Sequence, residues 1–412
     1  MERIPARKTK YFLLKTIRKS MLLLLISLCL FSHYHCQQSP ATVRSSFVYQ
    51  PPLYSNIALQ TKPDSIHFAL DGRTSNAISS FNYFLDKGKP FIFFYDRATK
   101  SLLFYNFNNR SIVQKVPIKA WLFKEKFDKP VIYVINFDSI FITSKTKLFL
   151  LDSSGKTKKI MEQYSDDSKF IISDNECPAY IKDSLLLVGN APNVKETSLP
   201  AHQKWRVITA FNLSNSQKTQ YYELPTIYQS ALYGYSYLNY SYCFNDRKNI
   251  VFSFAADTNI YETDLASYHK AYNAQSKLQK EVIHPISKSD IQEGKSYTEY
   301  SLQDSYGGIH FDPYHKRYLR LFKQKVPSLA NVYKNRIRKR SIIIFDKSFR
   351  IIGESDVDDS FAFSTIFFTQ DGKIYARVNG QDETTLHFAR LDYVQQHPDS
   401  TPQLTQSAIQ AK

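Results

Sequence analysis

The chain has 412 residues, of which 43% are hydrophobic and 15% aromatic, and its formal net charge is +17. This composition excludes a disordered chain and supplies enough apolar surface for a large core. The 29 Tyr and 30 Phe, with only 11 Gly, favour β-sheet over helix, because aromatic side chains lose rotamer freedom against a helical turn. The positive charge predicts attraction to anionic surfaces such as phospholipid head groups, acidic glycans or nucleic acid.

The N-terminal segment has the pattern of a secretory signal peptide. Seven Lys and Arg side chains precede the apolar run Met21–Phe31. At ~1.5 Å rise per residue this run spans roughly half of a bilayer's hydrocarbon core, so it is a signal-peptide core and not a membrane-spanning helix. We therefore expect residues 1–36 to be a signal peptide. Export argues against nucleic acid as the partner.

Cys36 follows the apolar run directly, at the position where bacterial lipoproteins are cleaved and acylated. It is the predicted lipid attachment site, which would hold the protein on a membrane of the cell envelope. The residues His33–His35 are larger than those usual before such a cysteine, so the lipobox is degenerate and ordinary secretion is the alternative. A secreted eukaryotic protein is a further alternative, permitted by N-glycosylation sequons at Asn109, Asn212 and Asn239.

The mature part of the chain keeps two further cysteines, Cys177 and Cys243. In an oxidising envelope they could form a disulfide, and in a buried setting they could stay thiols. Their sequence positions leave both readings open.

A Ser, Pro and Gln-rich spacer, residues 37–52, is expected to be a flexible tether. After it come short apolar runs separated by polar turns, the pattern of β-hairpins. The clearest unit predicts three antiparallel strands, at Pro90–Asp96, Ser101–Phe107 and Ser111–Ile118.

The same layout recurs along the rest of the chain. The later copies lie at Val131–Asp152, Ser184–Leu224, Asn249–Asp264, Arg317–Gly353 and Ser364–Tyr393. Weak repeats spaced about 50 to 80 residues apart are typical of propeller blades, since one small sheet buries its faces only when neighbours stack around an axis. We predict an all-β fold, a β-propeller over residues 53–395, with six blades and seven as the alternative.

Two segments depart from the strand pattern. Tyr261–Val282 carries apolar residues among Lys, Gln and Ala, and we expect a short helical insertion there. The polar tail, residues 396–412, is expected to fray and be disordered.

Several motifs, taken in their order along the chain, resemble a known family. They are Phe91–Asp96, Leu150–Lys156, Val251–Ala255, Gly308–Tyr314 and Ile342–Asp346. Together they are similar to uncharacterised Bacteroidetes lipoproteins that carry a TolB-like, six-bladed propeller domain of unknown function. The resemblance covers about residues 50–395. It implies a propeller fold and an envelope lipoprotein, and it brings no known activity.

The densest polar cluster is the candidate ligand-binding site: His310, Asp312, His315, Arg317 and Arg320. No metal is predicted, because further ligands are not evident nearby and two His five residues apart on a strand or turn do not converge on one ion. The structural alternative is a turn, in which Asp312 accepts from backbone amides. Arg317 and Arg320 are three residues apart, so on a strand they face opposite sides.

Two charged segments have a structural and a functional interpretation. The cationic run Lys334–Arg340 is expected to be a solvated loop, with phosphate or acidic-sugar binding as the alternative. The acids at Asp166–Asp167 and Asp356–Asp359 are interpreted as surface turn residues, since they lack the spaced oxygen ligands of a calcium loop.

No Gly-x-Ser-x-Gly elbow, P-loop, dinucleotide fingerprint or His-Glu-x-x-His motif occurs in the sequence. We therefore predict no cofactor and no catalysis, but a binding or assembly module with an envelope protein or a glycan as partner. The alternative is a propeller hydrolase or lyase acting on extracellular carbohydrate or lactone. Convergence of His310, Asp312 and other acids at the propeller axis would favour that alternative.

Overall fold

The computed structural model describes residues 46–118, 131–143, 147–162, 170–172, 175–191, 195–334, 338–380 and 382–396. These residues all belong to one unit, Thr42–Lys412. The expected signal peptide with Cys36, the expected tether up to residue 45, and the tail beyond residue 396 lie outside the described residues.

The described strands form six sheets, and consecutive sheets along the chain are the blades of a propeller. Blade 1 consists of β3 (Ile78–Asp86), β4 (Lys89–Asp96), β5 (Ser101–Asn106) and β6 (Ile112–Pro117). Blade 2 consists of β7 (Val131–Asn136), β8 (Ser139–Thr143), β9 (Lys147–Leu151) and β10 (Thr157–Glu162). Blade 3 consists of β11 (Phe170–Ile172), β12 (Tyr180–Lys182), β13 (Leu185–Ala191), β14 (Arg206–Asn212) and β15 (Lys218–Glu223).

The other three blades follow the same plan. Blade 4 consists of β16 (Tyr240–Phe244), β17 (Ile250–Phe254), β18 (Asn259–Thr263) and β19 (His269–Asn273). Blade 5 consists of β20 (Ser305–Asp312), β21 (Arg317–Lys323), β22 (Arg340–Phe345) and β23 (Ile351–Val357). Blade 6 consists of β24 (Phe361–Phe368), β25 (Ile374–Val378), β26 (Thr385–Gln395) and β2 (Ile57–Ala69). The prediction of a six-bladed, all-β propeller is confirmed.

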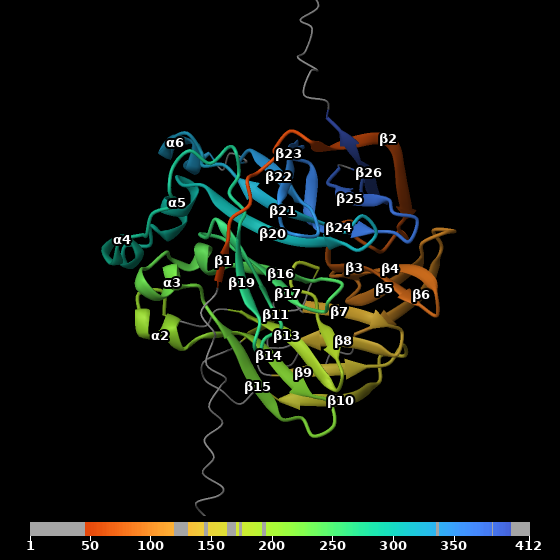
Figure 1. Cartoon of the computed structure of the whole chain (residues 1–412). Coiled ribbons are helices and arrows are strands. Elements are labelled where there is room, and N and C mark those ends of the chain that lie inside the picture. Colours follow the sequence, from red (N-terminus) through yellow and green to blue (C-terminus); the bar gives the residue numbers. More distant parts are fainter. Residues whose placement is uncertain are drawn as a thin grey trace, which may run out of the picture. The chain divides into compact units, whose positions relative to one another are not determined.

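Blade 6 closes the ring by combining the two ends of the folded chain. β2 pairs antiparallel with β26, so the first long strand completes the last blade (Figure 1). The start of β2 also lies against blade 5, where a Cβ on Gly353 would overlap the carbonyl oxygen of Ile57. A glycine is therefore required at this contact. Ring closure covers the apolar faces that the two end blades of an open row of sheets would expose.

The core lies between the blades, and alternate residues of one strand face different neighbours. In β4, Phe93 packs in a cluster with Ile132 and Ile140 of blade 2. Its neighbour Phe94 packs in another cluster with Phe388 of blade 6. Because side chains alternate across a strand, a blade sandwiched on both faces needs apolar residues at consecutive positions. This explains the uninterrupted run Phe91–Tyr95.

The polar residue that ends many strands closes a hairpin with its own side chain. The Asp96 carboxylate, for example, accepts hydrogen bonds from the backbone amides of Ala98 and Thr99. Such side chains stabilise a tight turn because they satisfy amides that the ladder no longer pairs. The same arrangement follows other strands, at Asn106, Asp152, Asn212, Asp264 and Asp346.

The two ends of the propeller differ. At one end, here called the turn face, connections of two to five residues join the first strand of a blade to the second and the third to the fourth. At the opposite end, the helix face, several connections carry helices, and Figure 1 shows these helices gathered on one side. The helices are α2 (Leu199–Lys204), α3 (Thr226–Ser230), the 3-10 helix η2 (Tyr235–Leu238), α4 (Lys288–Gln292), α5 (Ser296–Ser301) and α6 (Leu329–Tyr333). No helix in the described ranges is long and apolar enough to cross a membrane.

The helix predicted within Tyr261–Val282 is wrong. That segment holds the end of β18 and all of β19, joined by a tight turn in which Asp264 accepts from the amides of Ala266 and Tyr268. Short apolar spacings do not separate helix from strand when a turn interrupts them. The helical insertion lies further along, at α4 and α5 between blades 4 and 5.

The end of the expected tether is attached to the propeller. β1 (Ser46–Val48) pairs in parallel with β19 at the outer edge of blade 4. The Gln50 side-chain amide donates to the carbonyl oxygen of Ser348 at 2.8 Å. The flexible spacer predicted over residues 37–52 therefore does not extend to these described residues. A Ser-rich composition does not exclude pairing with an exposed strand edge.

Candidate functional site

The five residues of the predicted ligand site all belong to β20, β21 or the turn between them. The structure does not bring them into one pocket. They lie in three separate surroundings: Arg320 between two blades, Asp312 with His315 and Arg317 on the turn face, and His310 at the propeller axis.

Arg320 is fully buried between blades 4 and 5. Its Nη2 donates to the carbonyl oxygen of Asp257 at 2.6 Å, and its Nη1 to that of Thr258 at 3.0 Å. Its guanidinium also lies 3.8 Å from the ring centroid of Tyr306. Burial lowers the pKa of Arg320 to about 10, so it stays charged at neutral pH. Arg320 joins two blades and is not available to a ligand.

Asp312 closes the turn between β20 and β21, as the turn interpretation predicts. Its buried carboxylate accepts from the amides of Tyr314 and His315 and from Nδ1 of His315 at 2.8 Å. These bonds fix the imidazole beside the turn. The carboxylate therefore serves the turn and does not face the axis.

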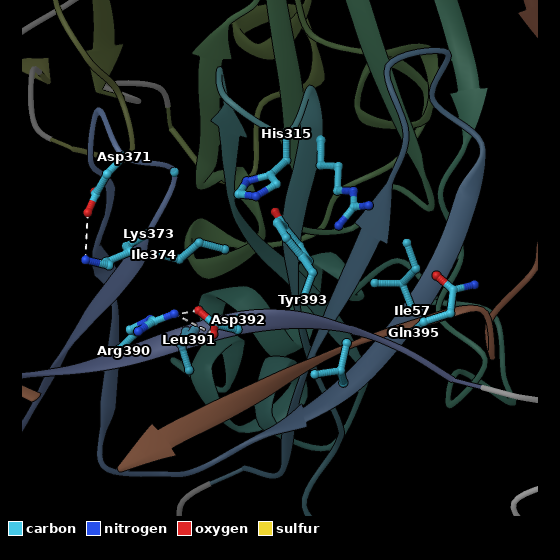
Figure 2. Close-up of a pocket in the computed structure, with 13 residues that line it drawn as sticks. Ile57, His315, Asp371, Lys373, Ile374, Arg390, Leu391, Asp392, Tyr393 and Gln395 are labelled. Atoms are coloured by element: carbon cyan, nitrogen blue, oxygen red, sulfur yellow. Dashed lines mark hydrogen bonds and ion pairs between the residues drawn. The ribbon is translucent and has the colours of Figure 1, made fainter. Parts of the chain in front are cut away.

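His315 and Arg317 line a groove on the turn face between blades 5 and 6, with a volume of about 530 Å³. Figure 2 shows the Tyr393 side chain reaching toward His315, and the two ring centroids are 5.0 Å apart. The Arg317 guanidinium lies 4.2 Å from the Tyr393 ring centroid. Two of the predicted residues thus share this groove.

The other charges of the groove largely compensate one another. Lys373 pairs with Asp371 at 2.7 Å, and Arg390 pairs with Asp392 at 2.8 Å (Figure 2). Cations already paired with carboxylates have little left to offer an anionic ligand. The groove is polar but presents no concentrated charge.

His310 lines a different cavity, at the propeller axis. Its side chain is buried, its ring centroid is 4.8 Å from that of Phe363, and its Nε2 has no hydrogen-bond partner within the described part of the chain. Burial lowers the pKa of His310 to about 4, so the imidazole is neutral at pH 7.

This axial cavity has a volume of about 330 Å³ and opens at the turn face. The innermost strand of every blade contributes an aromatic side chain to it, and for this reason we place it on the axis. The aromatic residues are Tyr83, Tyr133, Tyr180, Phe244, Phe311, Phe367 and Phe368.

Neighbouring blades bring some of these rings into contact. The Tyr180 and Phe244 rings, from blades 3 and 4, are stacked with centroids 4.2 Å apart. The Tyr83 and Phe367 rings, from blades 1 and 6, are stacked at 5.3 Å. Each stack fixes the rings of two separate sheets in one orientation. The cavity wall is therefore ordered by packing between blades.

The described residues that line the axial cavity are uncharged. Within the described chain no Asp, Glu, Lys or Arg contributes to it. Burial raises the pKa of Tyr83 and of Tyr133 to about 12, so these phenols stay neutral at physiological pH. The net charge of +17 is carried elsewhere.

A second cavity of about 260 Å³ lies nearer the helix face and is lined mainly by residues of blades 4 and 5 and their connections. Along β20, Gly308 lines this cavity and Phe311 lines the aromatic one, so the two cavities follow each other. Its lining is more polar and includes Glu176, Ser241 and Lys323. A Cβ on Gly308 would clash with the Glu176 carboxylate and with Phe363, so a glycine lets these two side chains pack closely against β20.

The chain was compared with protein families and with solved structures. The model of the domain of unknown function DUF4221 matches residues 56–356. The chain belongs to this family. A crystal structure of a DUF4221 member from Bacteroides vulgatus is 18% identical, covers 83% of this chain and 99% of that chain, and superimposes with a TM-score of 0.69. At this identity the match shows the fold.

Other solved structures resemble the DUF4221 chain less closely. A streptogramin B lyase is 10% identical and covers 82% of this chain and 98% of its own, with a TM-score of 0.42. A gluconolactonase from Xanthomonas campestris is 8% identical and covers 83% and 98%, with a TM-score of 0.43. TM-scores this low give no ground for assigning the activity of either protein to this chain. No curated protein matches the chain.

The convergence that would favour a hydrolase or lyase is not seen in this DUF4221 chain. His310 lies at the axis, but Asp312 is engaged in the turn. Glu176 is the one acid that lines either axial cavity in the described residues. Within the same described ranges no three His, Cys, Asp or Glu side chains cluster closely enough to hold a metal ion.

The cationic run Lys334–Arg340 is solvated only in part: Lys334 and Lys339 are exposed, as expected, but Arg338 and Arg340 are not. Arg338 donates to the carbonyl oxygens of Gln324 and Lys323, and burial lowers its pKa. Arg340 donates to the carbonyl oxygen of Phe361 at 3.0 Å. Arg338 thus joins the connection after β21 to the segment before blade 5, and Arg340 joins β22 to the start of blade 6. Residues 335–337 lie outside the described residues.

The remaining singled-out residues have structural surroundings. Cys177 and Cys243 are both buried thiols, and burial raises the pKa of Cys243. The Asp358 carboxylate accepts from the amide of Ser360, as expected of a turn acid. Asp166–Asp167 lies outside the described residues.

Sequence reasoning found His310 but missed the aromatic lining around it. Its members come from six segments spread over almost 300 residues, so no local motif contains them. The signal available in the sequence is one aromatic near the end of each innermost strand, for example Tyr83, Phe244 and Phe311. Reading that signal requires the inner strands to be identified first.

Proposed function

We propose that this chain is an exported propeller, held in the bacterial cell envelope by a lipid on Cys36, that binds a ligand without transforming it. The observation that carries this proposal is the axial cavity with an aromatic side chain from every blade. Small-ligand sites in proteins are concave, mostly apolar and roughly 300–1,000 Å³ in volume, and this cavity is within that range.

The fold supports binding because it prepares the cavity in advance. Each ring stands on the innermost strand of a four-stranded or larger sheet, and rings of adjacent blades stack on one another. A site whose side chains are already ordered loses little conformational entropy when the ligand arrives. A cavity wall that is ordered in advance therefore favours tight binding of a ligand.

The cavity's chemistry argues against turnover. General acid and base catalysis needs groups that exchange protons near neutral pH and lie within hydrogen-bond reach of the reacting atoms. The lining offers one neutral imidazole, with a pKa of about 4, and phenols with raised pKa values. We therefore favour a binding or assembly module over a hydrolase or lyase.

The envelope location rests on the N-terminal sequence: a basic segment, an apolar run and then Cys36. It agrees with the lipoprotein character that the resemblance to TolB-like propellers implies. The partner we propose is an envelope protein or a glycan, with membrane contact through the lipid and no role for nucleic acid.

The anchor is tested by labelling. Cells that express the wild type should incorporate labelled palmitate into the protein, and cells that express Cys36→Ala should not. Equal labelling of the two would refute the anchor.

The binding function is tested by affinity purification of the tagged full chain from cross-linked cell envelopes. Phe311→Ala removes one ring of the cavity, and Tyr297→Ala removes a ring that is 60% exposed on the helix face. We expect envelope components to be recovered with the wild type and with Tyr297→Ala, and to be lost with Phe311→Ala. Equal recovery with all three proteins would contradict the axial site, and consumption of a recovered ligand would contradict binding without turnover.

A further inference from the structure

The aromatic lining of the axial cavity is divided into two halves. Blades 1, 2 and 3 contribute tyrosines, Tyr83, Tyr133 and Tyr180, whose rings carry hydroxyl groups. Blades 4, 5 and 6 contribute Phe244, Phe311 and the pair Phe367–Phe368, which offer hydrocarbon alone. A ligand that fits both halves combines an apolar face with groups that form hydrogen bonds.

The described lining of the axial cavity carries no charge, which disfavours an anionic ligand. A carboxylate or phosphate that enters such a cavity loses its hydration and finds no cation in return, which is unfavourable by several kcal/mol. The acidic glycans and phospholipid head groups suggested by the net charge therefore do not suit this cavity. A helix is excluded too, because its diameter of roughly 10–12 Å is too large for a cavity of about 330 Å³.

His310 adds a polar group that the protein itself leaves unsatisfied. Its Nε2 is buried and has no partner among the described residues. A neutral imidazole has one donor and one acceptor nitrogen, so Nε2 can accept a hydrogen bond from a ligand when the proton is on Nδ1. An unsatisfied buried group of this kind is uncommon in folded proteins and calls for an explanation. A ligand hydroxyl that donates to Nε2 would supply one.

Because Nε2 is covered, a ligand reaches it only if a neighbouring ring moves. The stacking surface is accessible without such a movement, since Tyr180, Phe244 and Phe311 are half-buried. We therefore expect stacking to contribute more to affinity than the bond to His310.

We propose that the axial cavity binds a neutral sugar ring, stacked on the phenylalanine half and hydrogen-bonded by its hydroxyls on the tyrosine half and at His310. A sugar ring presents C–H groups on its faces and hydroxyls around its rim, and the negative face of an aromatic ring attracts C–H groups. This inference rests on the proposed function, since it names the ligand class of the same site.

The test is isothermal titration calorimetry on the purified full chain. The neutral probes are the tetrasaccharides of glucose (α1,4 and β1,4), xylose, mannose and N-acetylglucosamine, and the acidic probe is tetragalacturonate. We expect at least one neutral probe to bind and the acidic probe not to bind. Phe311→Ala and Phe244→Ala should each weaken binding about tenfold, which corresponds to about 1.4 kcal/mol.

Two further variants separate stacking from a general loss of structure. Tyr297→Ala on the helix face should bind as the wild type does. His310→Gln should weaken binding by a smaller factor than Phe311→Ala. Thermal melting of each variant confirms that it is folded before titration.

Each failure has a distinct meaning. Binding of tetragalacturonate alone, or no binding of any probe, overturns the sugar assignment; the proposed function still stands if Phe311→Ala loses the envelope components that the wild type recovers. Neutral-probe binding that Phe311→Ala and Phe244→Ala leave unchanged overturns the axial location. If Phe311→Ala also recovers every envelope component, the proposed function fails as well.

Discussion

The two ends of the axial channel show how one scaffold produces two kinds of surface. At the turn face, short connections repeat around the ring, and each blade places an aromatic residue at the same mouth. At the helix face, all the described helices come from the connections of blades 3, 4 and 5, and the cavity there is lined by Glu176, Lys323 and hydroxyl groups. The repeated short connections thus surround a cavity whose described lining is uncharged. The inserted helices produce an irregular, polar surface.

The helix face also exposes aromatic residues, but they are not enclosed. Tyr235, Tyr297 and Tyr333 are 48%, 60% and 74% exposed. They stand on η2, α5 and α6, and α5 contacts both of the others. The same residue type therefore forms a cavity wall at one end and an open surface at the other, which gives matched controls for substitutions of the cavity tyrosines.

The largest expected effect concerns Arg320, whose hydrogen bonds hold connections at the helix face together. Arg320→Met removes donors from the buried carbonyl oxygens of Asp257 and Thr258, and we expect the free energy of unfolding to fall by about 3–5 kcal/mol. Urea unfolding measures the change. Arg317→Met, on the same strand but in the open groove, should lose less than about 1 kcal/mol. Equal losses would show that Arg320 does not join the blades.

The second-largest effect is the pH dependence of the free energy of unfolding that His310 introduces. The folded protein keeps His310 neutral, with a pKa of about 4, whereas an unfolded histidine takes up a proton near pH 6.5. The unfolded state therefore binds more protons between these values, and stability falls as the pH falls through this window. Through His310, the wild type should lose about 2–3 kcal/mol of its free energy of unfolding between roughly pH 7 and pH 4. His310→Leu should not show this part of the loss.

This difference is measured by urea unfolding of both proteins at each pH. Burial raises the pKa values of Tyr83, Tyr133 and Cys243, which also line the cavity, so these groups do not exchange protons in that window. Parallel pH profiles for wild type and His310→Leu would mean that His310 is not buried as a neutral base.

A smaller effect separates the tyrosine half of the cavity from its phenylalanine half. Tyr180→Phe keeps the ring and removes one hydroxyl, so affinity for a neutral sugar should fall by about 0.5–1.5 kcal/mol in calorimetry. Tyr297→Phe, the matched change on the helix face, should have no effect. A loss in Tyr297→Phe of the same size would move the site to the helix face.

The smallest effect is expected at the polar cavity. Lys323→Gln removes a charge that lines it, and sugar affinity should stay within about 0.4 kcal/mol, or twofold, of the wild type. A tenfold loss would mean that the ligand extends along the axis into the second cavity.

The strands sandwiched between blades could be predicted from the sequence, and several innermost strands could not. Pro90–Asp96 matches β4 closely because both of its faces are buried and every position from Phe91 to Tyr95 is apolar. β20 is not predicted as a strand and part of it is assigned to a polar cluster, because it contains Gly307 and Gly308 and polar residues such as His310 and Asp312. β2 was missed because its middle, Lys62-Pro63-Asp64, is polar and Pro63 lies at the bulge where its register against β26 shifts.

The site was only partly predictable for a related reason. Polar density along the chain located His310, but it also selected Arg320, which is a buried link between blades. Charge in a sequence does not distinguish a ligand contact from a bond to backbone carbonyl oxygens. The aromatic lining depends on ring closure, which joins residues as distant as Tyr83 and Phe367 in one stacked pair.

The most direct test of the account is ¹⁹F NMR of the full chain labelled with 3-fluorotyrosine, with resonances assigned by single Tyr→Phe substitutions. On addition of the neutral tetrasaccharide that binds in calorimetry, we predict that the resonances of Tyr83, Tyr133 and Tyr180 shift and those of Tyr235, Tyr297 and Tyr333 do not. Shifts confined to the second set would place binding on the helix face and contradict an axial site at the turn face.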